Sequence, residues 1–430
     1  MKKTIGFWRS WALVVGTMIG SGIFLIPSVL APYGSISLLG WFLTAFGALL
    51  IALTLGSLST RVEKEGGPYA YCHELIGPAV GFFMGWGLWV SFWLAIAASS
   101  LAFSGYVSAM FPLFDHEGVF RTLISLLLVW CLASFFLLGI RGVGFLQLLT
   151  TILKLMPLLL IPALGFLYGD QSLSETLVYN KEVGFFEQIS KVILITMFAF
   201  LGIEVATIPA NETINPKKTI HRALFFGLLS VSFVYFFATM GVWLALPTDA
   251  LSNSPSPFAD AAEILIGPIG ATVITIGIMI SIIGSMNGSL LAAVLLPQSM
   301  ASDKLFPKMF QDKNKYEAPW KSLAIVVMLI SVVLLLGSTT NLVTYYEKLL
   351  ILSTLTAILP FAACAIAELV LQVRERHSHS INIFTLLRAL GALIFSVCMI
   401  IGGGLESVIY GAFILAAGAP IYLRYKRTNR

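Results

Sequence analysis

The chain places two glycines around a serine, Gly20-Ser21-Gly22, inside its first long hydrophobic stretch, Trp11 to Leu30. A helix that spans a bilayer has to satisfy its backbone polar groups internally, because lipid offers no hydrogen-bond partners. Glycine weakens a helix at such a place. An interruption is tolerated where the freed N–H and C=O groups line a cavity, as in the broken helices of transporters. A glycine pair that only lets two helices pack closely is the alternative interpretation.

Composition indicates a membrane protein with many spans. Of the 430 residues, 58% are hydrophobic and 11% are charged, whereas soluble domains carry about 25% charge. The first stretch is too long for the apolar core of a signal peptide, so we expect it to be kept. We expect residues 1–430 to form a single transmembrane domain. Hydropathy predicts twelve spans, at 10–31, 37–59, 79–110, 121–139, 145–168, 187–209, 221–245, 268–295, 321–338, 343–367, 383–402 and 405–423.

Lysine and arginine predict the orientation of these spans. With the N-terminus in the cytoplasm, 21 of the 26 cations fall on the cytoplasmic side and 3 fall outside. The other 2, Lys154 and Lys191, are assigned to neither side and count as span residues. We therefore expect both termini in the cytoplasm. The net charge of +5 does not indicate nucleic-acid binding, because the cations lie in short loops beside the spans.

A broken first span would offer two kinds of backbone group at the middle of the membrane. The second half would begin near Ile23, where free N–H groups and the positive helix end suit a carboxylate. The first half would end near Thr17 and Met18, whose carbonyl oxygens suit an ammonium group. One break thus provides both contacts that an α-amino acid needs.

The sixth span carries a second candidate break at Gly202, with Phe198 about one turn before it and Glu204 just after it. Spans 1 and 6 would open the two halves of a five-plus-five inverted repeat, and breaks at matching places indicate a binding site at the membrane midplane. We expect Glu204 to accept hydrogen bonds from backbone N–H groups of the break rather than to touch a substrate. Phe198 is placed to cover a bound ligand.

Lys154 lies within the fifth predicted span, where a charged lysine is costly. Because burial penalises the charged amine, such a lysine could bind and release a proton, and we expect a role in coupling. A permanent polar tie to backbone carbonyls is the alternative. Lys191 lies near the outer end of the sixth span and is expected to reach the interface.

The sequence indicates neither an enzyme nor a cofactor. No cluster of His, Asp or Cys lies inside a predicted span, and the four cysteines have no metal-type spacing. Cys72 is placed in a short loop. The chain also has no Walker-type phosphate loop. We therefore expect a protein that is not an enzyme and holds no metal or other cofactor.

Several motifs resemble those of the amino acid–polyamine–organocation transporters. The first span contains residues 16–24, Gly-Thr-Met-Ile-Gly-Ser-Gly-Ile-Phe, followed by Pro27. The loop after the second span contains residues 66–71, Gly-Gly-Pro-Tyr-Ala-Tyr. Further markers lie at 200–204, 215–218, 256–261 and 305–307. The resemblance implies an all-α polytopic membrane protein of the LeuT type, with repeats at about 10–168 and 187–367 and accessory helices at about 383–423.

The resemblance also implies roles for individual residues. The amides of Ser21 and Gly22 would hold the substrate carboxylate, Phe198 matches an aromatic gate, and Lys154 matches a lysine that replaces a sodium ion in sodium-independent members. The implied substrate-binding residues are Thr17, Met18, Gly20, Ser21, Gly22, Phe198, Leu201 and Gly202.

Within this family the pattern is most similar to bacterial antiporters of the arginine/agmatine type, but the pocket differs. Ile96, Phe198 and Ser289 stand where that exchanger has asparagine, tryptophan and tryptophan, so the partners for a cationic side chain are lost. We therefore predict secondary transport of small, neutral amino acids across a bacterial inner membrane, by proton symport or by exchange, through alternating access. An antiporter of basic amino acids or polyamines is the alternative.

Two further hypotheses are weaker. A transporter of the major facilitator type would need a basic motif with an aspartate after span 2, where this chain has residues 61–67, Arg-Val-Glu-Lys-Glu-Gly-Gly. A membrane sensor without transport usually has a soluble output domain, and only a short basic tail follows Leu423. The expected partners are an amino acid, protons or a counter-substrate, and membrane lipid, without nucleic acid, and a homodimer is left open.

Overall fold

The computed structural model describes residues 6–62, 66–111, 118–137, 154–172, 183–204, 213–375 and 383–428. Its helices are α1 (Phe7–Met18), α2 (Gly22–Leu30), α3 (Ser35–Ser59), α4 (Pro68–Leu75), α5 (Pro78–Met110), α6 (Gly118–Phe136), α8 (Leu155–Tyr168), α10 (Phe185–Ala199), α11 (Pro216–Ala245), α12 (Thr248–Asn253), α13 (Pro257–Ser302), α14 (Trp320–Leu336), α15 (Leu342–Glu375), α16 (Ile383–Gly402), α17 (Gly404–Ala416) and α18 (Ala419–Thr428). Two short 3₁₀ helices are η1 (Ala31–Tyr33) and η5 (Lys308–Gln311).

The described residues contain eight segments that are long and apolar enough to cross a membrane, and the pair α1 and α2 forms a further, bent span. Two shorter apolar helices, α8 and α14, add to these. The prediction of a polytopic all-α membrane protein is therefore confirmed. The number of twelve spans stays a prediction, since residues 145–153 and 205–209 of two predicted spans lie outside the described part of the chain.

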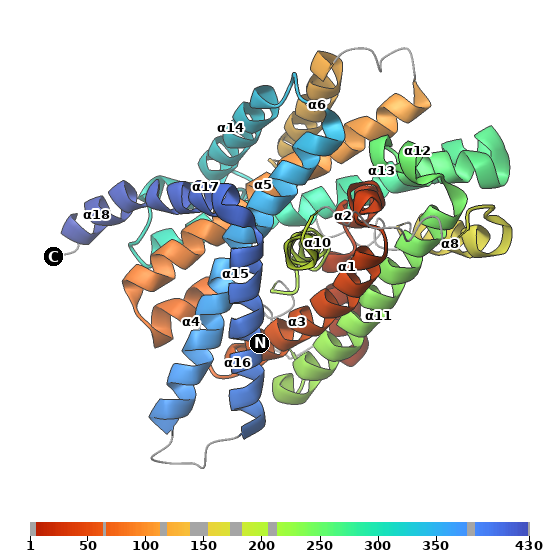
Figure 1. Ribbon diagram of the computed structural model, residues 1–430. Helices are drawn as coiled ribbons and strands as arrows, with labels where there is room; N and C mark the ends of the chain where they lie inside the picture. Colours follow the sequence, from red (N-terminus) through yellow and green to blue (C-terminus); the bar gives the residue numbers. More distant parts are fainter. Residues whose placement is uncertain are drawn as a thin grey trace.

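The broken pair α1 and α2 lies beside α10 in the middle of the bundle (Figure 1). α3 and α11 pack along each other on one side, and α5 contacts both α13 and α15. α17 and α18 lie at the periphery. All nine residues of α2 are buried. A helix that is apolar on every face belongs in the core, so α2 is enclosed by the rest of the bundle.

Three elements differ from the sequence prediction. α13 begins eleven residues before its predicted span because Pro257 opens a helix before the membrane segment, and Gly267, with φ 75°, interrupts it. The last predicted span is divided into α17 and α18. Cys72 lies in helix α4 and not in a loop, because Pro68 at the first helical position starts a helix there.

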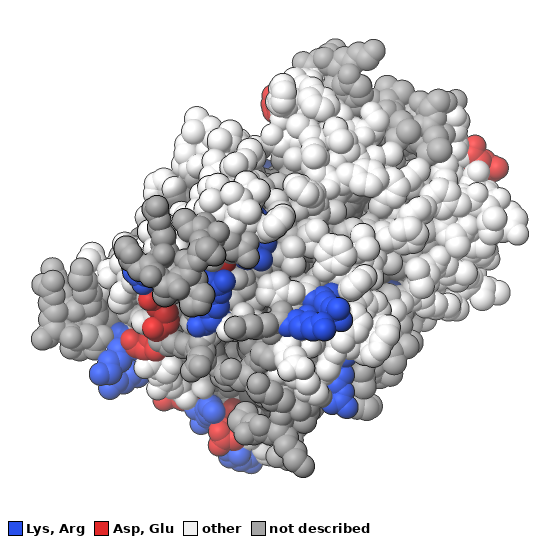
Figure 2. Space-filling model, turned by 90° about the horizontal axis from the view of Figure 1, so that it is seen from below, with Lys and Arg blue, Asp and Glu red and all other residues white. Residues whose placement is uncertain are grey.

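One end of the bundle is rich in lysine and arginine (Figure 2). It is the end at which α1 and α11 begin and α15 finishes. Arg9, Lys218, Arg222 and Arg374 are exposed there. This is the end that the cation count places in the cytoplasm.

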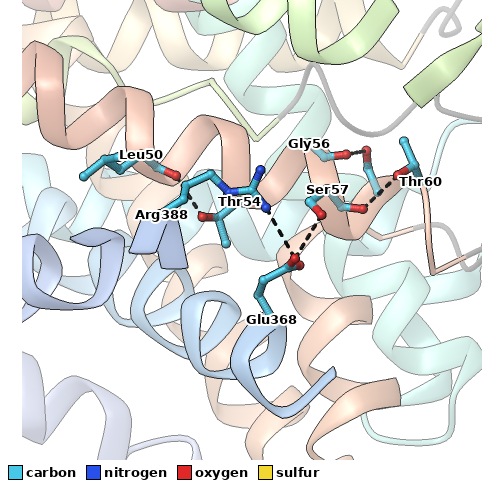
Figure 3. A network of polar contacts seen from close by, with 8 residues as sticks. Leu50, Thr54, Gly56, Ser57, Thr60, Glu368 and Arg388 are labelled. Carbon is cyan, nitrogen blue, oxygen red and sulfur yellow. Dashed lines mark hydrogen bonds and ion pairs between the residues drawn. The ribbon is translucent and has the colours of Figure 1, made fainter. Parts of the chain in front are cut away.

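A buried ion pair joins three helices near the same end (Figure 3). Nη2 of Arg388 on α16 lies 3.3 Å from Oε1 of Glu368 on α15. The hydroxyl of Ser57 on α3 donates a hydrogen bond to the same carboxylate oxygen at 3.0 Å. The side chain of Glu368 is fully buried, so the pair fastens α16 to α3 and α15 inside the protein.

Candidate functional site

The first span is broken where the sequence predicts it. α1 ends at Met18 and α2 begins at Gly22, with a bend of 48° between them, so the second half starts one residue before the expected position. The backbone N–H groups of Ser21, Gly22 and Ile23 donate no hydrogen bond to any residue that the structure describes. The start of α2 therefore presents free donors and a positive helix end at membrane depth.

Lys154 fills the carbonyl side of this break. Its ammonium donates to the backbone oxygen of Ile19 at 2.7 Å and also to that of Gly16. Only 1% of the lysine surface is exposed, so these carbonyls stand in for the water that a lysine normally binds. Lys154 directly precedes α8, and the rest of its predicted span, 145–153, lies outside the described residues.

The second break begins earlier than predicted. α10 ends at Ala199, three residues before Gly202. Gly202 has φ 106°, a conformation that glycine adopts without strain. Its N–H donates to Oε2 of Glu204 at 3.0 Å, so the carboxylate accepts from the backbone of the break. Residues 205–212, which follow, lie outside the described part of the chain.

The two breaks touch each other. The hydroxyl of Thr17 donates to the backbone oxygen of Gly202 at 3.2 Å. The hydroxyl of Tyr235, on α11, reaches the backbone oxygen of Met18 at 2.6 Å and that of Ala199 at 3.1 Å. The carbonyl of Met18 in the first break and the carbonyl of Ala199 at the end of α10 thus share the Tyr235 hydroxyl as their donor. These contacts connect the two breaks directly.

A cavity of about 290 Å³ lies beside both breaks, near the lower limit of about 300 Å³ for ligand pockets. All eight residues predicted to bind a substrate border it, and so does Glu204. The remaining bordering residues are Leu13, Ser91, Phe92, Ala95, Ser99, Ala199, Ser285, Gly288, Ser289, Leu291 and Ala292. Lys154 is not among them and lies behind the break.

The cavity extends from the breaks toward the end of the bundle at which α1 begins, since Leu13 on α1 and Ser91 on α5 border it. Phe198 closes the other direction. Its ring lies against Gly22, where a Cβ atom would be 3.0 Å from Cδ1, and it packs edge-on against Tyr346 at 6.3 Å. Of α2, only Gly22 borders the cavity.

Some residues of the site were missed by sequence reasoning. Oγ of Ser99 lies 2.5 Å from Oγ of Ser21, and Tyr235 holds the breaks together. A tyrosine and paired serines inside hydrophobic spans are the signals that could have identified them. Ile96 is buried and does not border the cavity, whereas Ala95 and Ser99 of the same helix do. Ile96 therefore does not shape the pocket as predicted.

Comparison with known proteins agrees with this architecture. The sequence profile of the amino acid permease family matches residues 5–418. The chain is 29% identical to a putative arginine/ornithine antiporter of Bacillus subtilis, over 98% of this chain and 96% of that protein. It is 28% identical to the serine/threonine exchanger SteT of the same organism (99% and 98%) and 26% identical to an arginine/agmatine antiporter of Chlamydia pneumoniae (98% and 90%). With a bent first span, a second break against it and a profile match over nearly its whole length, the chain belongs to the amino acid permease family of the amino acid–polyamine–organocation superfamily.

Proposed function

We propose that the protein exchanges small, neutral amino acids across a bacterial inner membrane by alternating access. One observation carries the proposal: the amides of Ser21, Gly22 and Ile23 lack acceptors among the described residues, next to a cavity that Ser21 and Gly22 border. Such a group of N–H donors suits a carboxylate. The chemistry of this site is binding and release, so the protein is a transporter and not an enzyme.

The substrate would lie across the two breaks. Its carboxylate accepts from the amides of Ser21 and Gly22, and its ammonium group faces carbonyl oxygens of Thr17 and Leu201. The carbonyl of Met18 already accepts from Tyr235 but has a second lone pair. Phe198 lies against Gly22 and covers the bound molecule from the α2 side.

The pocket walls favour a polar side chain. The hydroxyls of Ser91, Ser99 and Ser289 belong to bordering residues and can exchange hydrogen bonds with a substrate hydroxyl. A relative over nearly the full chain is named a serine/threonine exchanger. Serine or threonine is therefore the substrate we would test first.

Exchange of basic amino acids is the second candidate. Glu204 is the ionisable side chain among the described residues that border the cavity. Other relatives over nearly the full chain are named arginine/ornithine antiporters. A cationic side chain that displaced the Gly202 N–H from Glu204 would gain a charged partner.

Transport would follow from rearrangement of the two breaks. With the N-terminus in the cytoplasm, the side of the cavity that Leu13 and Ser91 border would face inward, and the buried α2 would close the outer side. We propose repeats at about 10–168 and 187–367 that rock about the breaks. Lys154 would couple this motion to protons, because the positively charged amine binds the carbonyls of Gly16 and Ile19 more strongly than the neutral amine does.

Counterflow in proteoliposomes tests the proposal. Vesicles loaded with unlabelled serine should take up labelled serine faster than empty vesicles, and unlabelled arginine in the lumen should be a poor counter-substrate. Strong counterflow with arginine and none with serine or threonine would replace the first candidate by the second. No counterflow with any amino acid of a full panel would refute both.

Gly22→Val tests the binding pose. The added Cβ would lie 3.0 Å from the Phe198 ring and 3.5 Å from Cα of Ala199, beside the amides that hold the carboxylate. Serine binding should therefore be lost. Gly411→Val on α17 is the matched control, since no atom lies within 4 Å of its added Cβ, and it should bind normally. Normal affinity in Gly22→Val would place the carboxylate elsewhere.

A further inference from the structure

A second hollow lies outside the transport site, on the membrane-facing side of the bundle. It is an apolar groove of about 420 Å³ between α3 and α11. Phe42, Phe46 and Phe233 are each more than 60% exposed along it. The groove is bordered by Trp41, Phe42, Ala45, Phe46, Leu49, Phe225, Leu228, Leu229, Ser232, Phe233, Phe236 and Phe237. Its wall is almost entirely carbon, which suits a hydrocarbon chain.

We propose that this groove binds one acyl chain of an anionic phospholipid, whose phosphate lies on Lys218 and Arg222. The site is distinct from the cavity beside the breaks, and none of its residues borders that cavity. The proposal does not depend on which amino acid is transported.

The charge pattern of α11 supports an anionic headgroup. Lys218, Arg222, Phe225, Leu229 and Phe233 follow one another at steps of four, three, four and four residues, which places them on one face of the helix. Both cations are exposed, and neither forms an ion pair with a carboxylate in the described part of the chain. Cations at the inner membrane surface attract anionic lipid.

The length of the groove fits one leaflet. Phe233 lies eleven positions after Arg222, and at a rise of 1.5 Å per residue the two are about 16 Å apart along the helix axis. Half of a hydrocarbon core of about 30 Å is about 15 Å. A lipid whose phosphate meets Arg222 would therefore lay its chain along the groove as far as Phe233.

The two cations of α11 also disfavour a second copy of the chain in the groove. Two copies in a membrane are related by an axis along the membrane normal, so the same end of α11 would meet in both. Lys218 and Arg222 of each copy would then face each other, and like charges would repel. A lipid phosphate instead neutralises both cations.

The groove contacts the transport site through its floor. Trp41 packs against Tyr235, with ring centroids 5.5 Å apart, and against Phe200 at 6.0 Å. The hydroxyl of Tyr235 holds the carbonyls of Met18 and Ala199 at the two breaks. A chain seated on Trp41 would stabilise the packing of α3 and α11 that positions this hydroxyl. We therefore infer that the lipid stabilises the state with the cavity open toward the start of α1.

Native mass spectrometry of the purified full chain tests the site with phosphatidylglycerol and phosphatidylcholine as probes. The unaltered protein should retain phosphatidylglycerol in preference to phosphatidylcholine. Lys218→Gln/Arg222→Gln should lower phosphatidylglycerol retention by about tenfold, because both headgroup contacts are removed. Ala45→Trp should lower it similarly by filling the groove. Phosphatidylglycerol should also raise the melting temperature of the unaltered protein and not that of either variant.

Matched variants separate the site from general effects. Lys308→Gln/Lys315→Gln removes the same charge from other segments, and Leu43→Trp adds the same ring on an exposed position of α3 outside the groove. Both should retain lipid normally. Equal retention in all four variants would overturn the proposal. A dimer that Ala45→Trp converts to a monomer, with lipid retention unchanged, would overturn it in favour of a second copy.

Discussion

Lys154 and Glu368 are both buried charges among membrane-spanning helices, and the protein compensates them in opposite ways. Lys154 donates to backbone carbonyls of Gly16 and Ile19, which are freed because the first span unwinds. Glu368 accepts from the side chains of Arg388 and Ser57 (Figure 3). The helices α3, α15 and α16, which carry Glu368 and its partners, continue without interruption through this contact.

This difference indicates that Lys154 belongs to the transport site, whereas the Glu368 pair holds helices together. The partners of Lys154 exist only while the break keeps its present shape, so a change in the break changes the energy of the lysine charge. The partners of Glu368 are side chains on two helices, α3 and α16, and neither Glu368 nor these partners border the cavity. We therefore expect Lys154 to govern transport and Glu368 to govern stability.

The largest effect is expected for Lys154→Ala. It leaves two buried carbonyls without their donor, at a cost of about 1–3 kcal/mol each. Transport should fall by about a hundredfold, since 1.4 kcal/mol corresponds to about tenfold. The residual rate should not vary with pH, as measured by counterflow in proteoliposomes between pH 5 and 8.

Lys191→Ala is the control for this change. Lys191 forms an ion pair with Glu347 at 2.9 Å and is 43% exposed, away from the break. Its removal should leave the pH profile intact. An unchanged pH profile in Lys154→Ala would remove the lysine from coupling and leave the permanent tie as its role.

Glu368→Gln should act on stability instead. It leaves the Arg388 guanidinium beside a neutral partner in the protein interior, and breaking a buried pair costs about 3–5 kcal/mol. The melting temperature in detergent should fall markedly, while serine affinity stays within about twofold. Glu368→Leu/Arg388→Met should recover much of the loss, because no charge remains unpaired. Lost affinity at normal stability would contradict the division between the two regions.

Local interruptions could be predicted from the sequence, and partners across the bundle could not. Two glycines in an apolar run have a physical consequence wherever the run folds in lipid, so the break at Gly20-Ser21-Gly22 was identified to within one residue. Arg388 is one of the 21 cations counted on the cytoplasmic side, but its partner Glu368 could not be predicted, because pairing depends on how helices dock. Nothing in its neighbourhood along the chain indicates that contact.

The wall of the cavity was also beyond sequence reasoning. One residue along a helix turns the side chain by about 100°. A resemblance that is uncertain by one position therefore exchanges Ile96, which is buried elsewhere, for Ala95, which borders the cavity. Tyr235 lies 217 residues after Met18, and only packing brings its hydroxyl to that carbonyl.

Tyr235→Phe examines the contact between the breaks without removing a charge. It deletes hydrogen bonds to Met18 and Ala199, each worth about 0.5–1.5 kcal/mol. The transport rate should fall while the melting temperature changes little, because both acceptors belong to the breaks that we propose to rearrange during transport. Tyr345→Phe is the matched control, since its hydroxyl donates to Val333 outside the site. Equal effects of the two changes on transport would show that the breaks need no shared donor.

Ser99→Ala should have the smallest effect, and it tests where the transport site ends along α5. The Ser99 hydroxyl donates to Ala95 at 2.7 Å and lies 2.5 Å from the Ser21 hydroxyl, so the change frees Ser21 to face the cavity. Because one hydrogen bond contributes about 0.5–1.5 kcal/mol, serine affinity should shift by less than about tenfold. Ser100→Ala removes the neighbouring hydroxyl, which donates to Ala97 and does not border the cavity. A shift in affinity for Ser99→Ala alone would set the edge of the transport site between two adjacent residues of α5.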